Sequence, residues 1–205
     1  MQLGFITSNQ GKLQELQTSL APLGHEVIQL KIDYPELQAN SIEAVAQFGL
    51  EWIKNNTEPN NAEIDPYKGL DLIFLEDSGL FIEALNNFPG VYSKFVFTTI
   101  GLSGILDLLK NEPNRNAHFE SCIAVCAPNP IIGTDDEGNK LLFFKGISNG
   151  TITTEPRGNM GFGFDPIFKP KETEKTFAEM TPEIKNRYSH RGAAIDKFAQ
   201  YLNSI

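Results

Sequence analysis

Hydrophobic residues in the first third of the chain alternate between short continuous runs and helical spacing. An apolar run at residues 3–7 predicts a strand, and leucines at positions 13, 16 and 20 then recur on one face of a helix. Residues 26–32 predict a second strand. A second helix is expected to begin after Asn40 or Ser41, and a loop rich in Asn, Pro and Gly follows at 55–69. The pattern is typical of alternating strands and helices.

The rest of the chain is richer in strand patterns. Residues 72–75 predict a buried strand that ends in a polar turn at 76–79, while residues 118–126 and 140–145 predict two paired strands. A helix is expected at 103–110, and the glycine-rich segment 156–166 is expected to be a loop. Thr181 before Pro182 is a typical helix start, and the last helix runs through residues 195–202. We therefore predict a mixed α/β sheet flanked by helices, in one domain spanning residues 1–205.

Composition and charge narrow the class of protein. The 205 residues include 26 acidic and 17 basic ones, a net charge of −9, whereas a general nucleic-acid binder normally carries a basic stripe. We therefore expect no nucleic-acid partner. No stretch approaches the ~18 consecutive apolar residues of a membrane span, and no secretory signal is visible, so we expect a cytoplasmic protein without membrane contact. Cys122 and Cys126 are too few for a disulfide framework.

The first polar turn joins a predicted strand to a predicted helix and is rich in hydrogen-bond donors. Its residues are Thr7, Ser8, Asn9, Gln10, Gly11 and Lys12. Backbone N–H groups and the dipole at a helix start favour an anion, and Lys12 adds a full positive charge. The turn lacks the pattern of a P-loop. The alternative for this segment is a plain helix cap with a surface lysine.

Two adjacent carboxylates, Glu76 and Asp77, follow the predicted strand at 72–75. Open α/β sheets bind ligands at the carboxyl edge of their strands, and carboxylate oxygens suit Mg²⁺. Glu36, in a connector after Pro35, is a candidate further ligand of the same ion. The alternative is a helix cap formed by Asp77 or Ser78.

A glycine-rich loop and a basic cluster lie in the C-terminal half. Glycines let a backbone approach a ligand closely, and aromatic rings can stack on a flat base; the loop offers Phe162, Gly163, Phe164 and Asp165. A hairpin loop with core aromatics is the alternative. The basic cluster is a candidate anchor for a phosphate or a base edge, or else a solvated helix face; it comprises Lys185, Arg187, His190 and Arg191.

One other chemistry is disfavoured. His118, Cys122 and Cys126 share one side of a predicted strand, but four residues of strand span ~13 Å, too far for one zinc ion.

Taken together and in this order, the motifs resemble those of the inosine/xanthosine triphosphate pyrophosphatase family, which hydrolyses non-canonical purine nucleoside triphosphates. The matching segments extend over nearly the whole chain. They are residues 7–12 (TSNQGK), 35–38 (PELQ), 76–80 (EDSGL), 89–93 (PGVYS), 161–166 (GFGFDP), 176–180 (TFAEM), Lys185 and residues 189–192 (SHRG).

The resemblance implies a two-lobed α/β fold with a central nucleotide cleft, a homodimer, and Mg²⁺-dependent cleavage of ITP, dITP or XTP to a nucleoside monophosphate and pyrophosphate. It implies that Thr7 to Lys12 hold the triphosphate, that Glu36 and Asp77 bind Mg²⁺, and that Asp77 activates water. Nucleotide contacts are implied for Ser78, Phe162, Gly163, Phe164, Asp165, Lys185, His190 and Arg191.

Two positions depart from the family pattern. Ser8 stands where glycine is common, and Phe48 stands where the family usually carries a lysine near the phosphates. Lys54, further along the same predicted helix, is a candidate replacement. We hypothesise weaker stabilisation of transition-state charge or an altered substrate range. Two alternatives therefore stay open: a nucleotide-binding module with little catalysis, and a pyrophosphatase for another modified nucleotide.

Overall fold

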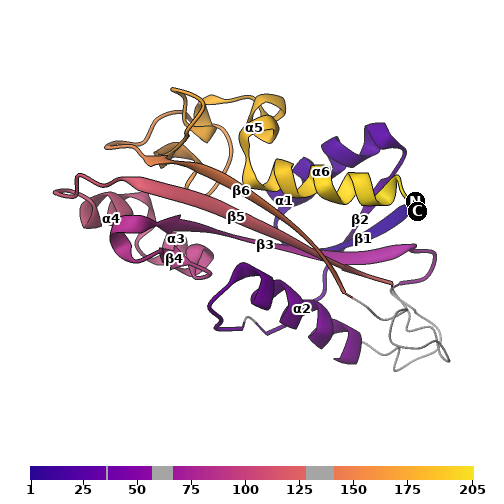
Figure 1. Ribbon diagram of the computed structural model, residues 1–205. Helices are drawn as coiled ribbons and strands as arrows, with labels where there is room; N and C mark the ends of the chain where they lie inside the picture. The colour runs from indigo at the N-terminus through magenta and orange to yellow at the C-terminus, as the bar shows by residue number, and fades with distance from the viewer. Residues whose placement is uncertain (36, 57–66, 128–140) are drawn as a thin grey trace.

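One mixed sheet organises the chain. The computed structural model describes residues 1–35, 37–56, 67–127 and 141–205, and seven strands of these segments form a single sheet in the order β2-β1-β3-β5-β6-β7, with β4 paired to β3 (Figure 1). The strands are β1 (Gln2–Ile6), β2 (Glu26–Leu30), β3 (Leu72–Ile82), β4 (Phe88–Gly90), β5 (Asn116–Cys126), β6 (Leu142–Ile152) and β7 (Phe168–Pro170). β1 runs parallel to β2 and β3, and the other pairs are antiparallel. The predicted mixed α/β sheet is confirmed.

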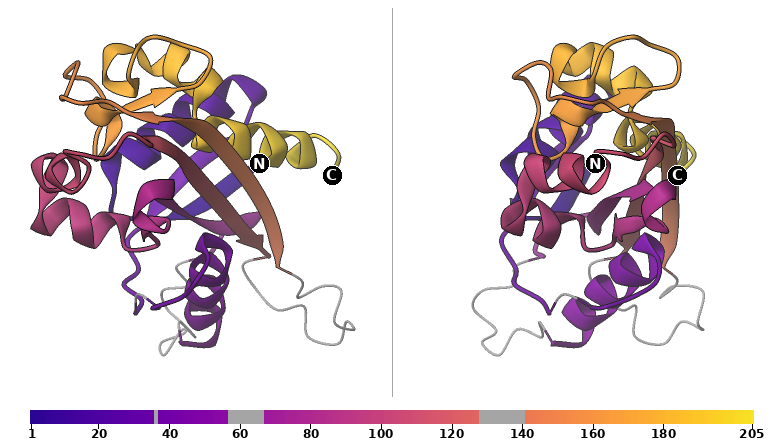
Figure 2. Two further views of the ribbon diagram at one scale, coloured as in Figure 1. Left: turned by 60° about the vertical axis from the view of Figure 1, so that its left-hand side comes forward. Right: turned by 90° about the vertical axis from the view of Figure 1, so that its left-hand side faces the viewer.

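Helices cover both faces of this sheet. They are α1 (Gln10–Leu20), α2 (Ile42–Asn56), α3 (Ser93–Thr99), α4 (Gly101–Leu108), α5 (Pro182–Tyr188) and α6 (His190–Leu202). α1 and α6 lie on one face and α2 on the opposite face, an arrangement that the two further views maintain (Figure 2). None of the described helices is long and apolar enough to cross a membrane.

The core follows from strand alternation on β3. Phe74 points toward α1 and α6, where it stacks on Phe5 and contacts Phe198. Its neighbours Ile73 and Leu75 point the other way and pack in a second apolar cluster with residues of α2. A third cluster fills the far end of the long strands, beneath α3 and α4. β3 and β5 therefore run through the whole molecule and join its two ends.

The predicted turn after the strand at 72–75 is wrong. β3 continues through residues 76–79 to Ile82, because this polar segment pairs residue by residue with β5, from Glu76 opposite Ile123 to Gly79 opposite Glu120. The predicted strand at 140–145 is also too short, since β6 extends to Ile152. Of the loop predicted at 55–69, residues 57–66 lie outside the described residues.

The helix starts predicted near Ser41 and Thr181 are confirmed, whereas the helix predicted at 103–110 spans Gly101–Leu108. The Ser41 hydroxyl accepts a hydrogen bond from the Ala44 N–H (3.2 Å), and Thr181 caps α5. Gly49 lies inside α2 because the ring of Tyr34 packs against it: a Cβ at position 49 would lie 2.7 Å from that ring. The helix therefore accepts a residue of poor helix propensity in exchange for a close contact.

Gly146 on β6 lets α6 rest directly on the sheet. A Cβ at this position would overlap the carbonyl oxygen of His190 and the backbone nitrogen of Ala194. We expect Gly146→Ala to lower the free energy of unfolding by about 3 kcal/mol, because two backbones must separate. Denaturant unfolding measures this. Ile147→Ala, at a neighbouring position that is 55% exposed, is the control and should cost less than about 1 kcal/mol; equal losses in the two variants would contradict the prediction.

Candidate functional site

β3 changes partners in the middle of the sheet. On the edge of β3 away from β5, the pairing with β1 extends as far as Leu75, and the pairing with β4 begins at Leu80. In the part of the chain that the structure describes, residues 76–79 thus have a strand neighbour on one side only. This opening corresponds to the edge at which open α/β sheets bind ligands.

A cavity of about 360 Å³ lies at this opening and includes Asp77 and Ser78 in its wall. Its other polar residues come from the connector before α2 and from the start of α3. The lining comprises Tyr34, Leu37, Gln38, Val45, Asp77, Ser78, Val91, Tyr92, Lys94 and Phe95. A carboxylate and an ammonium group therefore border one cavity, an arrangement suited to a metal-bound phosphate.

The turn after β1 leads to the same opening, because Ile6 pairs with Leu75. Asn9 caps α1 by accepting the Lys12 N–H (3.1 Å), and the Asn9 N–H donates to Thr7 Oγ1 (3.1 Å). Lys12 is not a surface lysine: its Nζ donates to the Glu76 carbonyl oxygen (3.1 Å) and pairs with the Glu76 carboxylate (2.8 Å). The segment is thus both a helix cap and a positioned cation.

Glu76 and Asp77 do not converge on one ion, which corrects the expectation from their adjacency. They are successive residues of a strand, so their side chains point to opposite faces. Glu76 is buried and accepts a hydrogen bond from Ser121 (2.6 Å), while its carboxylate also pairs with Arg191 Nε (3.2 Å). Asp77 is left to face the cavity.

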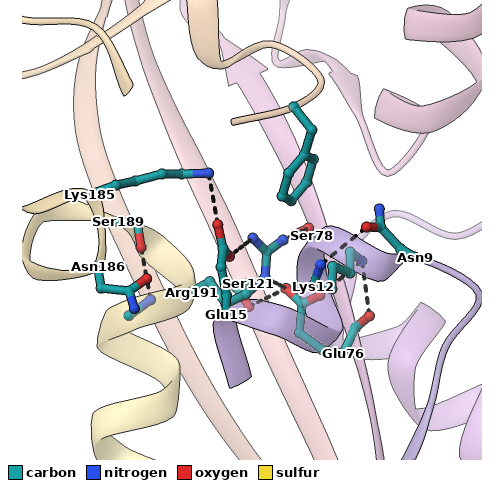
Figure 3. Close-up of polar contacts among 12 residues, drawn as sticks. Asn9, Lys12, Glu15, Glu76, Ser78, Ser121, Lys185, Asn186, Ser189 and Arg191 are labelled. Carbon is teal, nitrogen blue, oxygen red and sulfur yellow. Dashed lines mark hydrogen bonds and ion pairs between the residues drawn. The ribbon is translucent and has the colours of Figure 1, made fainter. Parts of the chain in front are cut away.

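The buried carboxylate of Glu76 is part of a larger ion network beside the cavity (Figure 3). Glu15 of α1 accepts hydrogen bonds from Lys185 (2.9 Å) and Arg191 (2.6 Å). Lys185 also pairs with Asp165 (2.7 Å), and Arg191 donates to Ser78 Oγ (3.0 Å). The network contains three cations and three carboxylates, and its charges balance. The cations are Lys12, Lys185 and Arg191, and the carboxylates are Glu15, Glu76 and Asp165.

The network shifts the pKa values of its three carboxyl groups in different directions. Burial opposes ionisation of Glu76, but the charges of Arg191 and Lys12 outweigh it and hold the pKa of Glu76 far below its usual range. The pKa of Glu15 is lowered in the same way by Arg191 and Lys185. Burial dominates at Asp165 and raises its pKa, although Lys185 acts against the shift.

The predicted aromatic and histidine contacts separate into two groups. Phe162 lies at the network: its ring centroid is 4.6 Å from Lys185 Nζ and 5.3 Å from Arg191 Cζ, and the ring packs over Gly11. Phe164 is buried and meets Phe97 edge-on. His190 is buried and stacks on Phe119 at 4.5 Å, and burial lowers the pKa of His190 well below its ordinary value. Phe164 and His190 therefore support the site from the core.

The metal ligands predicted from sequence are described only in part. Glu36 lies outside the described residues, although Tyr34 and Leu37, on either side of it, line the cavity with Asp77. Among the residues that the structure describes, no group of three or more His, Cys, Asp or Glu could hold a metal ion. Both Cys122 and Cys126 are buried.

Two residues of the site were missed by the sequence reasoning. Glu15 lies one helical turn after Lys12 on α1, and it belongs to none of the motifs found in the sequence. Lys94 directly follows the matched segment 89–93, and this adjacency was the signal. The backbone next to Lys94 is held in place because Ser93 Oγ accepts the Leu80 N–H (2.8 Å) and donates to the Gly90 carbonyl oxygen (2.7 Å).

Lys54, the candidate replacement for the lysine expected at position 48, lies elsewhere. Burial raises the pKa of the Cys126 thiol to about 12, and the charge of Lys54 acts against this shift. Cys126 pairs with Ile73 and Cys122 with Asp77, a separation of ~13 Å along the strand. Lys54 is also absent from the lining of the cavity.

Comparison with known proteins agrees with the motifs. The model of the Ham1 family matches residues 3–201. The chain is 49% identical over 202 residues to the dITP/XTP pyrophosphatase of Thermococcus kodakarensis, an alignment that covers 98% of this chain and 97% of the relative. It is 46% identical over 202 residues to the dITP/XTP pyrophosphatase of Pyrococcus horikoshii, with the same coverage.

Solved structures show the same fold. The HAM1 protein from Coxiella burnetii superimposes with a TM-score of 0.77 at 27% identity over the whole of both chains. The Ham1 protein of Staphylococcus aureus gives a TM-score of 0.76 at 25% identity, over 100% of this chain and 99% of that one. These comparisons confirm the resemblance that the motifs indicated, and the chain belongs to the Ham1 family.

Proposed function

We propose that this protein hydrolyses non-canonical purine nucleoside triphosphates (ITP, dITP and XTP) to the nucleoside monophosphate and pyrophosphate, and so removes them from the nucleotide pool. The names of the relatives in Thermococcus and Pyrococcus support this activity. The observation that carries the proposal is that Asp77 and Lys94 border one cavity, at the point where β3 lacks a second neighbour among the described strands. We further propose that the enzyme is a cytoplasmic homodimer.

Mg²⁺ is the proposed cofactor, and the donor set fits it. Asp77, whose carboxylate is a type of ligand that Mg²⁺ prefers, lines the cavity, and Gln38 and Tyr34, whose side chains also carry oxygen, lie in the same wall. Glu36 is the proposed second ligand, on the connector that contributes Tyr34 and Leu37 to the same wall. A bound Mg²⁺ would neutralise phosphate charge and lower the pKa of an attacking water. Asp77 would orient that water and accept its proton.

The triphosphate is proposed to lie along the opening of β3. Donors from Thr7, Ser8, Asn9, Gln10, Gly11 and Lys12 would hold it on one side, and Lys94 on the other. The ion network, which includes Lys12, is electrically balanced. It therefore adds no net positive charge to offset the negative charge of a triphosphate. Lys94 therefore takes the part that the family pattern assigns to a lysine at position 48.

The base is proposed to lie against the glycine-rich loop. Phe162 would stack on the purine, while Ser78, Gly163, Asp165, Lys185 and Arg191 would provide the polar contacts. A donor aimed at the 6-oxo group would be left unpaired by the 6-amino group of adenine, and such a mismatch can cost a large factor in kcat/KM. Phe164 and His190 are proposed not to contact the base but to stabilise the glycine-rich loop and the start of α6 through their packing in the core.

The first test is product analysis with Asp77→Asn. Incubation of the wild type with Mg²⁺ and ITP, XTP or dITP should give monophosphate and pyrophosphate, with little turnover of ATP. Asp77→Asn should lower kcat by at least about a hundredfold, because it removes both a metal ligand and the proton acceptor. Ion chromatography of the products measures this. Asp107→Asn, on an exposed position of α4, is the matched control and should retain activity.

Other products would reject the proposal. Orthophosphate and a diphosphate would mean that the terminal bond is cleaved. Nucleotide binding without turnover would favour the binding module, with Phe48 as the departure that accounts for it. Turnover of a modified pyrimidine triphosphate in preference to 6-oxo purines would favour the other pyrophosphatase.

The second test concerns Lys94. Lys94→Ala should lower kcat/KM for ITP by about tenfold to a hundredfold, equivalent to roughly 1.4–2.8 kcal/mol of transition-state stabilisation. The physical reason is the loss of a cation next to the phosphate chain. Lys110→Ala removes the same charge from an exposed position outside the cavity and should change kcat/KM less than twofold. Steady-state kinetics at fixed ionic strength compare the two, and equal values for both variants would show that Lys94 does not contact the phosphates.

A further inference from the structure

One carboxylate, that of Glu15, holds two of the cations proposed to contact the base. Each of its two oxygen atoms accepts one hydrogen bond: Oε1 from Lys185 (2.9 Å) and Oε2 from Arg191 (2.6 Å). The Glu15 side chain is 12% exposed, and those of Lys185 and Arg191 are 4% and 2% exposed. All three groups are therefore held within the protein and shielded from water, where charge interactions are strong.

The two cations would repel one another without a shared anion. Both lie over the ring of Phe162, with Lys185 Nζ 4.6 Å and Arg191 Cζ 5.3 Å from the ring centroid. Each has a second anchor: Lys185 pairs with Asp165, and Arg191 with Glu76. These anchors lie on different elements, the glycine-rich loop and β3. Glu15 is thus the one described carboxylate that contacts both cations and sets their separation.

Asp165 connects this arrangement to the loop. Its carboxylate accepts the Phe162 N–H (2.8 Å) as well as the Lys185 ammonium (2.7 Å). A shift of Lys185 would therefore move the loop that carries Phe162, and with it the surface against which a base would stack.

We infer that Glu15 is a positioning residue for base discrimination: by holding Lys185 and Arg191 together, it keeps the polar contacts to the purine edge aligned. The inference rests on the proposed function, because it assumes that this end of the site receives the base. It assigns Glu15 no contact with substrate and no part in the hydrolytic step.

The test compares Glu15→Ala, Glu15→Gln and Glu15→Asp. Alanine removes both acceptors, and glutamine turns a donor toward one of the two cations, so both variants should lower kcat/KM for ITP at least tenfold while that for ATP stays within threefold. Aspartate keeps the charge on a shorter side chain and should restore part of the loss. Binding of ITP and ATP can be measured by calorimetry in EDTA, where no turnover occurs. The Kd for ATP divided by the Kd for ITP should fall by the same factor as the ratio of kcat/KM values for ITP and ATP.

Ser19→Ala is the matched control. Ser19 lies one turn further along α1 and accepts a hydrogen bond from Asn186 of α5 (3.1 Å), so this variant weakens the same junction of helices without contacting either cation. It should leave the ITP to ATP ratio unchanged. Melting temperatures of all variants report any general loss of stability.

The outcomes separate the inference from the proposed function. If the wild type prefers ITP and the Glu15 variants keep that preference, with both substrates falling equally, Glu15 is only structural and the inference is wrong. If the wild type shows no preference for ITP in either turnover or binding, the proposed function and the inference both fail.

Discussion

The structure depends on a single strand that changes partners. β3 is paired with β5 from Ile73 to Ile82, but on its other edge the pairing with β1 ends at Leu75 and the pairing with β4 begins at Leu80. The backbone at 76–79 is thereby fixed by one neighbour and open to the other side. A rigid element with an open edge holds functional side chains better than a loop does, because packing limits their rotamers. The opening also explains why residues far apart in sequence, from the turn after β1 to the start of α3, meet there.

Strand alternation then divides the chemistry between two faces. Glu76 turns inward to a network of buried charges, and Asp77 turns to the cavity. Burying ions is costly, and breaking such a network by removing one partner leaves a charge unpaired at a cost of about 3–5 kcal/mol. Glu76, fully buried, meets this cost through Lys12, Arg191 and the Ser121 hydroxyl. The carboxylate next to the proposed catalytic one therefore contributes to the position of the cations rather than to metal binding.

Much of this could be predicted from the sequence, and the failures have clear physical causes. Local signals, such as the cap at Thr181 or the leucine spacing of α1, are encoded within a few residues and were predicted correctly. The turn expected at 76–79 failed because polar residues usually end a strand, whereas here partners from α1 and α6 neutralise Glu76 inside the sheet. Those partners are 64 and 115 residues away, and no spacing rule in the sequence reports them. Glu15 was missed for the same reason, since its role exists only once α1, α5 and α6 have packed together.

The balance of charge separates the tasks proposed for the two ends of the site. A triphosphate brings several negative charges, and a site that met them with the network cations alone would have to break pairs with Glu15, Glu76 or Asp165 for each phosphate bound. Reading a purine edge requires no net charge, only donors and acceptors fixed in direction, which is what an electrically neutral network of ion pairs provides. Lys94 and a cation held by Asp77 lie on the other side of β3, at the cavity, and would meet phosphate charge there without breaking those pairs. The lysine missing at position 48 is consistent with this division, because what the reaction needs is a cation at the cavity and not a cation on a particular helix.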